Sequence, residues 1–209
     1  MNNTLIRDIF LVILSYLAGS IPFCYLIAKI NKKDLTKLGD KNPGGWNLAF
    51  NVSRYWGFLG MVLDVAKGFL PYFIIFRYTG SEFVALIAGC AVISGHNYSP
   101  FLKFHGGKGI ASLLGLSLAI QPISVIVFGI GIVFGLIFIR NMIWGITSGL
   151  VSSTLFFTLY FNSIIYIIFG ILLLLIIIPK YLNHSIPLGK NFKFKKEKKL
   201  KDLFTPTSR

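Results

Sequence analysis

The stretch from Gly95 to Gly109 concentrates the groups of this chain that could do chemistry. It reads Gly-His-Asn-Tyr-Ser-Pro-Phe-Leu-Lys-Phe-His-Gly-Gly-Lys-Gly and lies between two apolar segments. Polar groups at membrane depth are costly and usually functional. Glycines followed by a lysine, where a helix restarts, are suited to holding a phosphate. His96, beside Asn97, could serve as a general base or as a hydrogen-bond donor to phosphate.

The end of this stretch predicts an anion cradle formed by Gly106, Gly107, Lys108 and Gly109. Their backbone amides would lie at the start of the next helix, where the helix dipole favours negative charge. The pattern is not the G-x-x-x-x-G-K-[ST] loop of nucleotide-binding proteins, so nucleotide hydrolysis has no support. The G-x-S-x-G turn of a serine hydrolase is absent as well.

A second polar segment, Gly39–Asn47, separates two apolar regions. Its glycines and its proline disfavour a regular helix, and the exposed amides of such a loop can form a nest for an anion. The residues of this loop that we expect to bind phosphate are Gly39, Lys41, Asn42, Gly44 and Asn47. The alternative interpretation is an ordinary turn between two helices.

A third polar group, Asp64 and Lys67, lies inside an apolar segment with a spacing that puts both on one helix face. The pair could be a structural ion pair, since mutual neutralisation lowers the cost of charges in a membrane. Alternatively, Asp64 could hold the Lys67 ammonium toward a phosphate. Asp40 and Asp64 are the only carboxylates near these segments, so we expect no metal site and no cofactor.

The elements that must position these groups follow from the composition. The chain has 209 residues, 55% of them apolar, and a mean hydropathy of +0.72. These values predict an all-α polytopic membrane protein with about seven transmembrane helices. The spans are expected at residues 9–30, 55–78, 83–95, 109–120, 123–139, 142–160 and 164–179. The third and fourth are short and flank the Gly95–Gly109 break, which favours short or broken helices around a site on the cytoplasmic side.

Within the spans, Gly131 with Gly135 and Gly145 with Gly149 have the spacing of close helix contacts. Both cysteines lie in apolar stretches and are interpreted as small buried residues. We expect one integral-membrane domain over residues 1–180 and a basic cytoplasmic tail over residues 181–209.

The charge distribution predicts the orientation of the chain. The formal net charge is +14, and lysine and arginine gather in alternate loops and in the C-terminal tail. With seven spans these regions share one side, which the positive-inside rule assigns to the cytoplasm, with the N-terminus outside. A lysine-rich tail can indicate nucleic-acid binding. Beside a membrane helix it is typical of a segment facing anionic lipid, so we expect a lipid bilayer and no nucleic acid as the partner.

Taken together, these motifs resemble the bacterial membrane-bound glycerol-3-phosphate acyltransferases that use acyl phosphate as the donor. The resemblance covers roughly residues 19–112, and it is carried by Gly19–Phe23, Gly39–Asn47, Asp64-x-x-Lys67-Gly68 and Gly95–Gly109. It implies seven helices in the bacterial inner membrane. It also implies transfer of an acyl chain from acyl phosphate to the sn-1 hydroxyl of glycerol 3-phosphate, giving lysophosphatidate and phosphate in phospholipid synthesis. The oligomeric state stays open, with a monomer allowed.

Both reactants of that reaction carry phosphate, which suits two glycine-rich loops. The expected catalytic residues are His96, Lys108 and Lys67. The expected substrate-binding residues are Gly39, Lys41, Asn42, Gly44, Asn47, Asp64, Asn97, Gly106, Gly107 and Gly109. His96 would orient or deprotonate the acceptor hydroxyl, with substrate phosphate as the alternative base. Positioning and charge neutralisation would supply most of the acceleration.

The chain departs from the family pattern in its first loop and near its C-terminus. The loop usually reads Gly-Ser-Gly-Asn, a variable residue, Gly, a small residue, Thr and Asn. At the Ser, second Gly and Thr positions this chain has Asp40, Lys41 and Trp46. A carboxylate facing a phosphate repels it unless a lysine compensates. The usual arginine is Phe50, and the closing Arg-His-x-x-Asn pattern is matched only loosely, by Lys180, Asn183 and His184.

Two other functions remain open on the same residues. One is a related membrane transferase that acylates a different phosphorylated acceptor. The other is a non-catalytic membrane protein that binds phospholipid or phosphate on the same scaffold.

Overall fold

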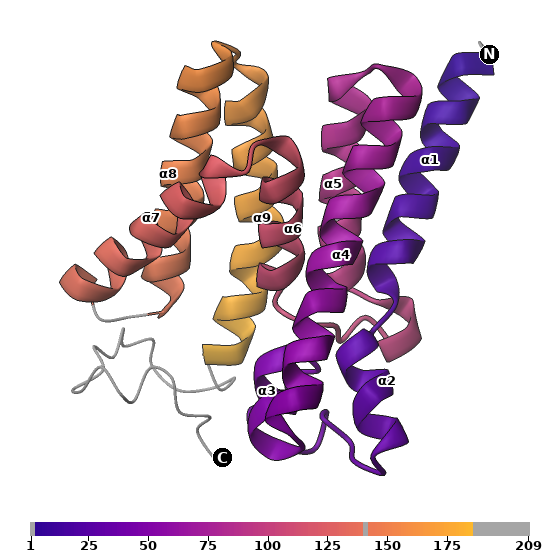
Figure 1. Cartoon of the computed structure of the whole chain (residues 1–209), viewed down its shortest axis with the longest axis vertical. Helices are drawn as coiled ribbons and strands as arrows, with labels where there is room; N and C mark the ends of the chain where they lie inside the picture. The colour runs from indigo at the N-terminus through magenta and orange to yellow at the C-terminus, as the bar shows by residue number, and fades with distance from the viewer. Residues whose placement is uncertain (1–2, 140–141, 186–209) are drawn as a thin grey trace. The chain divides into compact units, whose positions relative to one another are not determined.

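The computed structural model of the chain describes residues 3–139 and 142–185. Over these residues it is all-helical, with nine α-helices, one short 3-10 helix and no strand (Figure 1). The predicted all-α fold is confirmed. The predicted basic tail lies outside the described residues from residue 186 onward. The chain divides into two compact units, one ending at Ile120 and the other beginning at Gln121, and each is described by itself.

The first unit contains seven of these elements, which account for the first four predicted spans. They are α1 (Asn3–Ser20), α2 (Phe23–Ile30), α3 (Gly45–Asn51), α4 (Arg54–Thr79), α5 (Glu82–Asn97), the 3-10 helix η1 (Pro100–Leu102) and α6 (Ile110–Ile120). Helix α1 packs on α5, and α4 packs on α3, α5 and α6 (Figure 1). The second, third and fourth spans end within a few residues of the predicted positions.

The first predicted span differs from the prediction because it is two helices. Helix α1 ends at Ser20 and α2 begins at Phe23, with Ile21 and Pro22 between them. Proline has no amide hydrogen and cannot continue the α1 ladder, which frees carbonyl groups in the preceding turn. The hydroxyl of Ser99 donates to the carbonyl of Ser20 at 2.6 Å, and the Lys67 ammonium donates to that of Ile21 at 2.8 Å. Side chains from α4 and from the segment after α5 therefore satisfy the carbonyl groups that the break leaves without a partner.

Glycines let the helices of the first unit approach each other closely. A Cβ atom on Gly68 of α4 would collide with the backbone of Ser112 in α6. A Cβ on Gly19 of α1 would lie 2.6 Å from the Cα of Val92 in α5. Such contacts are typical of helices that associate in membranes, where small residues bring backbones together. They also hold α4, α5 and α6 at the distances that the polar groups described below require.

The second unit consists of α7 (Ile123–Ile139), α8 (Met142–Phe161) and α9 (Ile165–Ser185), in agreement with the last three predicted spans. Helix α8 packs on both α7 and α9. A Cβ on Gly131 would lie 2.8 Å from the Cα of Gly149, and a Cβ on Gly135 would lie 2.8 Å from the Cα of Gly145. The predicted small-residue pairs therefore form the α7–α8 contact.

Two helical stretches among the described residues are long and apolar enough to cross a bilayer. They are Asn3–Ile30, which includes the break at Pro22, and Arg54–Thr79. Shorter apolar helices cover Ile110–Ile120, Ile123–Phe138 and Ile165–Lys180. Residues on the outer faces of these helices are large and apolar, as in Phe58, Ile74, Ile126 and Leu175.

Candidate functional site

A buried ion pair between Asp64 and Lys67 lies at the centre of the first unit. The two residues are one turn apart on α4, and the Lys67 Nζ lies 2.8 Å from the Asp64 Oδ1. Their side chains are 3% and 5% exposed. Because Lys67 also donates to the carbonyl of Ile21, its ammonium ties α4 to the α1–α2 break. These contacts favour the structural interpretation of this pair over a Lys67 directed at phosphate.

Asp64 also connects α2 and α5 to this pair. The thiol of Cys24 donates to the Asp64 Oδ2 at 3.2 Å. The Nδ1 of His96 lies 3.7 Å from the Asp64 Oδ1 and 3.4 Å from the hydroxyl of Ser112 in α6. The Asp64 carboxylate thus contacts side chains from α2, α4 and α5, and such polar contacts stabilise a buried charge in an apolar interior. The roles of Cys24 and Ser112 could not be predicted from the sequence, because both residues approach Asp64 and His96 only through tertiary packing.

The other side of the His96 ring faces the second glycine-rich loop. A Cβ on Gly107 would overlap the His96 Nε2, and a Cβ on Gly106 would overlap the His96 carbonyl oxygen. Both positions therefore require glycine. His96 itself is 8% exposed, so its ring is packed between Asp64 and this loop. We expect it to fix the position of the loop relative to α4.

The amides of Gly106 and Gly107 differ from the sequence-based expectation. The Gly106 amide donates to the carbonyl of Asn97 at 3.1 Å, and the Gly107 amide donates to that of His96 at 2.9 Å. The two amides satisfy carbonyls at the end of α5, which have no partner within the helix. The prediction that both amides face a phosphate is corrected on this point. The two glycines contribute close approach to His96 and Asn97 instead.

Gly109 directly precedes α6 and lies beside Asn97, which is fully buried. Its φ of +83° lies in the left-handed region that favours glycine, and a Cβ there would lie 2.6 Å from the Asn97 Oδ1. The carbonyl of Gly109 accepts from the amide of Leu113 at 2.8 Å. Asn97 and Gly109 are therefore in contact, as the predicted site requires.

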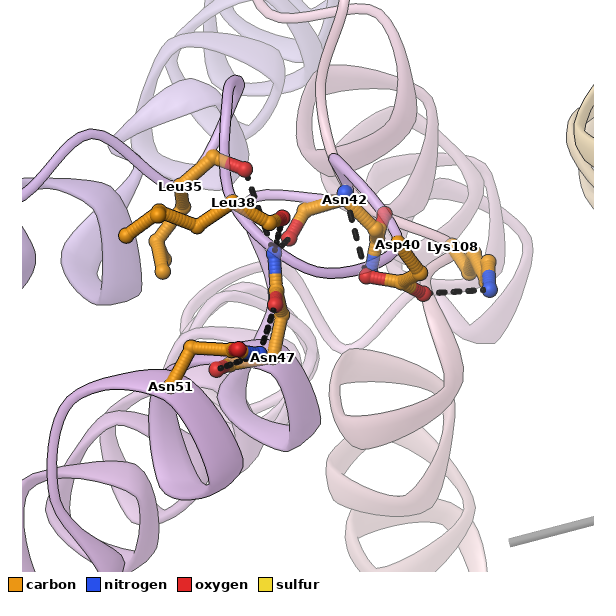
Figure 2. A network of polar contacts seen from close by, with 7 residues as sticks. All are labelled: Leu35, Leu38, Asp40, Asn42, Asn47, Asn51 and Lys108. Atoms are coloured by element: carbon orange, nitrogen blue, oxygen red, sulfur yellow. Dashed lines mark hydrogen bonds and ion pairs between the residues drawn. The ribbon is translucent and has the colours of Figure 1, made fainter. Parts of the chain in front are cut away.

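The first glycine-rich loop is held together by the amide of Asn47, which is 1% exposed (Figure 2). Its Nδ2 donates to the carbonyls of Leu35 at 3.1 Å, Leu38 at 2.9 Å and Asn42 at 2.9 Å. Its Oδ1 accepts from the Nδ2 of Asn51 at 2.7 Å. Because these bonds engage its amide hydrogens, we expect Asn47 to shape the loop rather than to bind phosphate directly.

Two residues of this loop have left-handed backbone conformations. Gly39 has a φ of +52°, and a Cβ there would overlap the side chains of Asn47 and Asn51. Lys41 has a φ of +58°, at the position where the family pattern has glycine. Its side chain is exposed and forms no ion pair with any residue that the structure describes. A Cβ on Gly44 would lie 2.7 Å from the Asn42 Nδ2, so Gly44 gives that amide room.

An ion pair between Asp40 and Lys108 joins the two loops. The Lys108 Nζ lies 3.1 Å from the Asp40 Oδ2, although 68 positions separate the residues (Figure 2). The Asp40 Oδ1 accepts from the amide of Asn42 at 3.2 Å. Lys108 follows Gly107, so a continuous set of contacts runs from the first loop through the second loop to His96 and Asp64. The three polar segments singled out by the sequence therefore form one cluster.

Comparisons with known proteins agree on one family. A model of the family described as glycerol-3-phosphate acyltransferase matches residues 9–189. The chain is 41% identical to a glycerol-3-phosphate acyltransferase of Thermosipho melanesiensis over 120 residues, which are 57% of this chain and 59% of that protein. The match to the enzyme of Leptospira borgpetersenii is 43% over 114 residues, 53% of this chain and 52% of that protein. The matched regions thus span little more than half of these two relatives.

A longer match joins the chain to a glycerol-3-phosphate acyltransferase of Endomicrobium trichonymphae, with 33% identity over 171 residues, 79% of this chain and 84% of that protein. Among solved structures, the chain is similar to PlsY (YgiH), an integral membrane glycerol 3-phosphate acyltransferase. Its glycerol 3-phosphate form has a TM-score of 0.76 and 30% identity, covering 85% of this chain and 89% of that chain. Its lysophosphatidic acid form has a TM-score of 0.74. This similarity confirms the predicted fold and a location in a membrane.

Proposed function

The chain belongs to the glycerol-3-phosphate acyltransferase family, and from this premise we propose that it transfers an acyl chain from acyl phosphate to glycerol 3-phosphate. The sn-1 hydroxyl oxygen attacks the acyl carbon and forms the ester bond. The bond from that carbon to the phosphate oxygen breaks, and phosphate leaves with the electron pair. The hydroxyl proton passes to a base, so the products are lysophosphatidate and phosphate.

The observation that supports this proposal is the joining of both glycine-rich loops through Asp40 and Lys108. The second loop carries the Lys108 ammonium and the first loop carries the exposed Lys41, and the reaction needs cations for two phosphates close together. Acyl phosphate is already an activated donor, so the reaction needs no covalent enzyme intermediate. Holding the hydroxyl against the acyl carbon and neutralising the phosphates would supply the acceleration.

Lys108 is the cation that we assign to the phosphates. Its side chain is 24% exposed, in contrast to the 5% of Lys67, and its partner Asp40 is 16% exposed, in contrast to the 3% of Asp64, so Lys108 is the more accessible of the two cations. Asp64, Lys67 and His96 then fix α4, α5 and the second loop around it. Because the His96 ring is packed between Asp64 and Gly107, phosphate is the better candidate for the base that takes the hydroxyl proton.

The charge distribution supports a position for this site on the cytoplasmic face of the bacterial inner membrane. The loop after α2 carries Lys32, Lys33, Lys37 and Lys41, and the glycine-rich run carries Lys103 and Lys108. We assign the N-terminus to the outside, residues 1–180 to one membrane domain and residues 181–209 to a basic cytoplasmic tail.

The test incubates the purified full-length chain with an acyl phosphate and labelled glycerol 3-phosphate. We expect lysophosphatidate and inorganic phosphate in equal amounts, and no product when acyl-CoA or acyl-carrier protein replaces acyl phosphate. Lys108→Met should lower kcat/KM by roughly tenfold to a hundredfold, since it removes a charge-assisted contact to phosphate. Lys103→Met is the matched control, because Lys103 is an exposed lysine of the same run. Absence of lysophosphatidate with every donor would overturn the proposal.

A second candidate, acylation of another phosphorylated acceptor, is favoured by one specific observation. Trp46 and Phe50, where the family pattern has threonine and arginine, form an aromatic pair with ring centroids 5.0 Å apart. Both are exposed, at 46% and 53%. This apolar pair lies on the helix that follows the first loop and could change which alcohol fits. Trp46→Thr should then create activity on glycerol 3-phosphate that the unchanged chain lacks, measured beside other phosphorylated alcohols.

A further inference from the structure

The carboxylate of Asp40 binds the Asn42 amide and the Lys108 ammonium, which are hydrogen-bond donors that a phosphate site needs. Its Oδ1 accepts from the amide of Asn42 at 3.2 Å, and its Oδ2 lies 3.1 Å from the Lys108 Nζ (Figure 2). The two side chains are only 16% and 24% exposed. A backbone amide and an ammonium are typical phosphate donors. In this conformation they bind an anion that belongs to the protein itself.

We propose that Asp40 is a specificity-determining residue whose carboxylate holds Lys108 until a doubly charged phosphate monoester displaces it. The inference rests on the proposed function in taking Lys108 as a phosphate ligand. It adds a selection by charge, since a singly charged anion gains too little from Lys108 to displace a carboxylate of equal charge. The surrounding bilayer is rich in singly charged phosphodiester head groups, and Asp40 excludes them from the site.

The charges of the competing anions decide this selection. A phosphate monoester carries a charge of about −1.5 to −2 near neutral pH and offers three strong acceptor oxygens. A phosphodiester carries a single negative charge. Only the monoester therefore exceeds the carboxylate as a partner for one ammonium. Like charges repel at such short range, so the carboxylate and the phosphate do not share Lys108 without a further cation.

The architecture of the loop allows the Asp40 side chain to move while the backbone stays in place. The loop is tied down by the bonds from Asn47 to the carbonyls of Leu35, Leu38 and Asn42. None of these bonds involves the carboxylate of Asp40. Rotation of that side chain toward solvent breaks its contacts to Lys108 and to the Asn42 amide but leaves the three bonds from Asn47 in place.

The experiment measures binding of two small probes to the purified full-length chain by calorimetry at pH 8, where inorganic phosphate is a dianion and dimethyl phosphate a monoanion. The unchanged chain should bind inorganic phosphate at least about tenfold more tightly than dimethyl phosphate. Asp40→Asn should tighten dimethyl phosphate binding by roughly threefold to tenfold, the range expected for removing a competing, partly exposed partner. The ratio of the affinity for inorganic phosphate to that for dimethyl phosphate should fall accordingly.

Asp34→Asn is the matched control. Asp34 lies in the same inter-helix segment, pairs with Lys29 at 3.5 Å, and loses the same charge on substitution. The Thr36 hydroxyl donates to it at 2.6 Å and holds the pKa of Asp34 below its ordinary value, so it too is ionised at pH 8. We expect no change in either binding constant. Asp40→Ser serves as a second variant, because its hydroxyl can still accept a hydrogen bond from the Asn42 amide. Adding Lys108→Met to Asp40→Asn should abolish the tighter binding of dimethyl phosphate.

Equal binding of dimethyl phosphate by the unchanged chain and both Asp40 variants would overturn the inference, and so would failure of the unchanged chain to bind phosphate. The outcome is separable from that of the proposed function. If Asp40 variants change dimethyl phosphate binding but no lysophosphatidate forms, only the proposed activity is rejected. If lysophosphatidate forms but the Asp40 variants bind both probes as the unchanged chain does, only the role of Asp40 is rejected.

Discussion

The ammonium of Lys67 donates to the carbonyl oxygen of Ile21, 2.8 Å away, at the point where Pro22 interrupts the first apolar span. The same ammonium lies 2.8 Å from the carboxylate of Asp64. One lysine therefore satisfies both a carbonyl freed by the break and a buried negative charge. An unpaired group of either kind is expensive in an apolar interior.

Replacing Lys67 with methionine should destabilise the protein strongly. The change keeps the length of the side chain but leaves the Asp64 carboxylate buried without its cation, a loss of about 3–5 kcal/mol in comparable pairs. Thermal unfolding in detergent measures it. The control Lys29→Met should leave the unfolding temperature almost unchanged, because Lys29 is half exposed in its pair with Asp34 and water screens that pair. A Lys67→Met protein that unfolds like the parent but no longer binds phosphate would instead assign Lys67 to the ligand.

Replacing Gly107 with alanine should displace the second loop. The added methyl group would overlap the His96 ring, and an overpacked interior costs about 1–3 kcal/mol. We expect acyl transfer to fall at least about tenfold, because a displacement of about 1 Å moves Lys108 away from its working position. Gly129→Ala is the control, since nothing lies within 4 Å of a Cβ there. Activity of Gly107→Ala equal to that of the parent would contradict the packing of His96 against the loop.

Replacing Asn47 with alanine should loosen the first loop. Three backbone carbonyls lose their donor, and a buried acceptor left unsatisfied costs about 1–3 kcal/mol. Hydrogen exchange of the loop amides should accelerate, while the exchange of α4 and α5 stays the same. Asn51→Ala removes the bonds from the Asn51 Nδ2 to the Asn47 Oδ1 and to the Asn47 carbonyl, leaves the three bonds from the Asn47 Nδ2 in place, and should have a smaller effect. The reverse order of the two effects would show that Asn47 does not organise the loop.

Replacing Lys41 with glycine should stabilise the loop. A left-handed conformation costs a residue with a side chain about 1–2 kcal/mol, and Lys41 has a φ of +58°. Glycine at this position relieves that cost, so the unfolding temperature should rise. Lys37→Gly has the same charge change at an exposed position of the segment and should not raise the unfolding temperature. A fall in the unfolding temperature of Lys41→Gly would mean that the lysine side chain stabilises the loop by more than its backbone costs.

The helices could be predicted from the sequence because apolar length dominates in a membrane. The span predicted at residues 123–139 coincides with α7, and four others end within a few residues of their helices, whereas α1 begins six residues before the predicted first span and α9 ends six residues after the predicted last one. The break at Pro22 is not evident from the sequence, since the apolar run from residue 9 to residue 30 continues through it. The break is stabilised by Lys67 and Ser99, which are distant in the chain, so local composition gave no sign of it.

The residue types of the candidate site could be predicted from the sequence, but the partners that these residues bind could not. Glycine, lysine and histidine in one short run indicated an anion site, and the family prediction is confirmed. The sequence did not indicate that the amides of Gly106 and Gly107 satisfy the end of α5, or that Asp40 pairs with Lys108. Both depend on which backbone comes close to which, and this is set by packing between helices.

The hydrogen bonds from Gly106 and Gly107 to the last carbonyls of α5 make the second loop a rigid extension of that helix. Moving it outward would break both bonds in an apolar interior. The first loop is joined to it by the ion pair of two partly exposed side chains, which water can replace. The contact between the two loops is therefore the one that can open at least cost, while the second loop stays anchored to the end of α5.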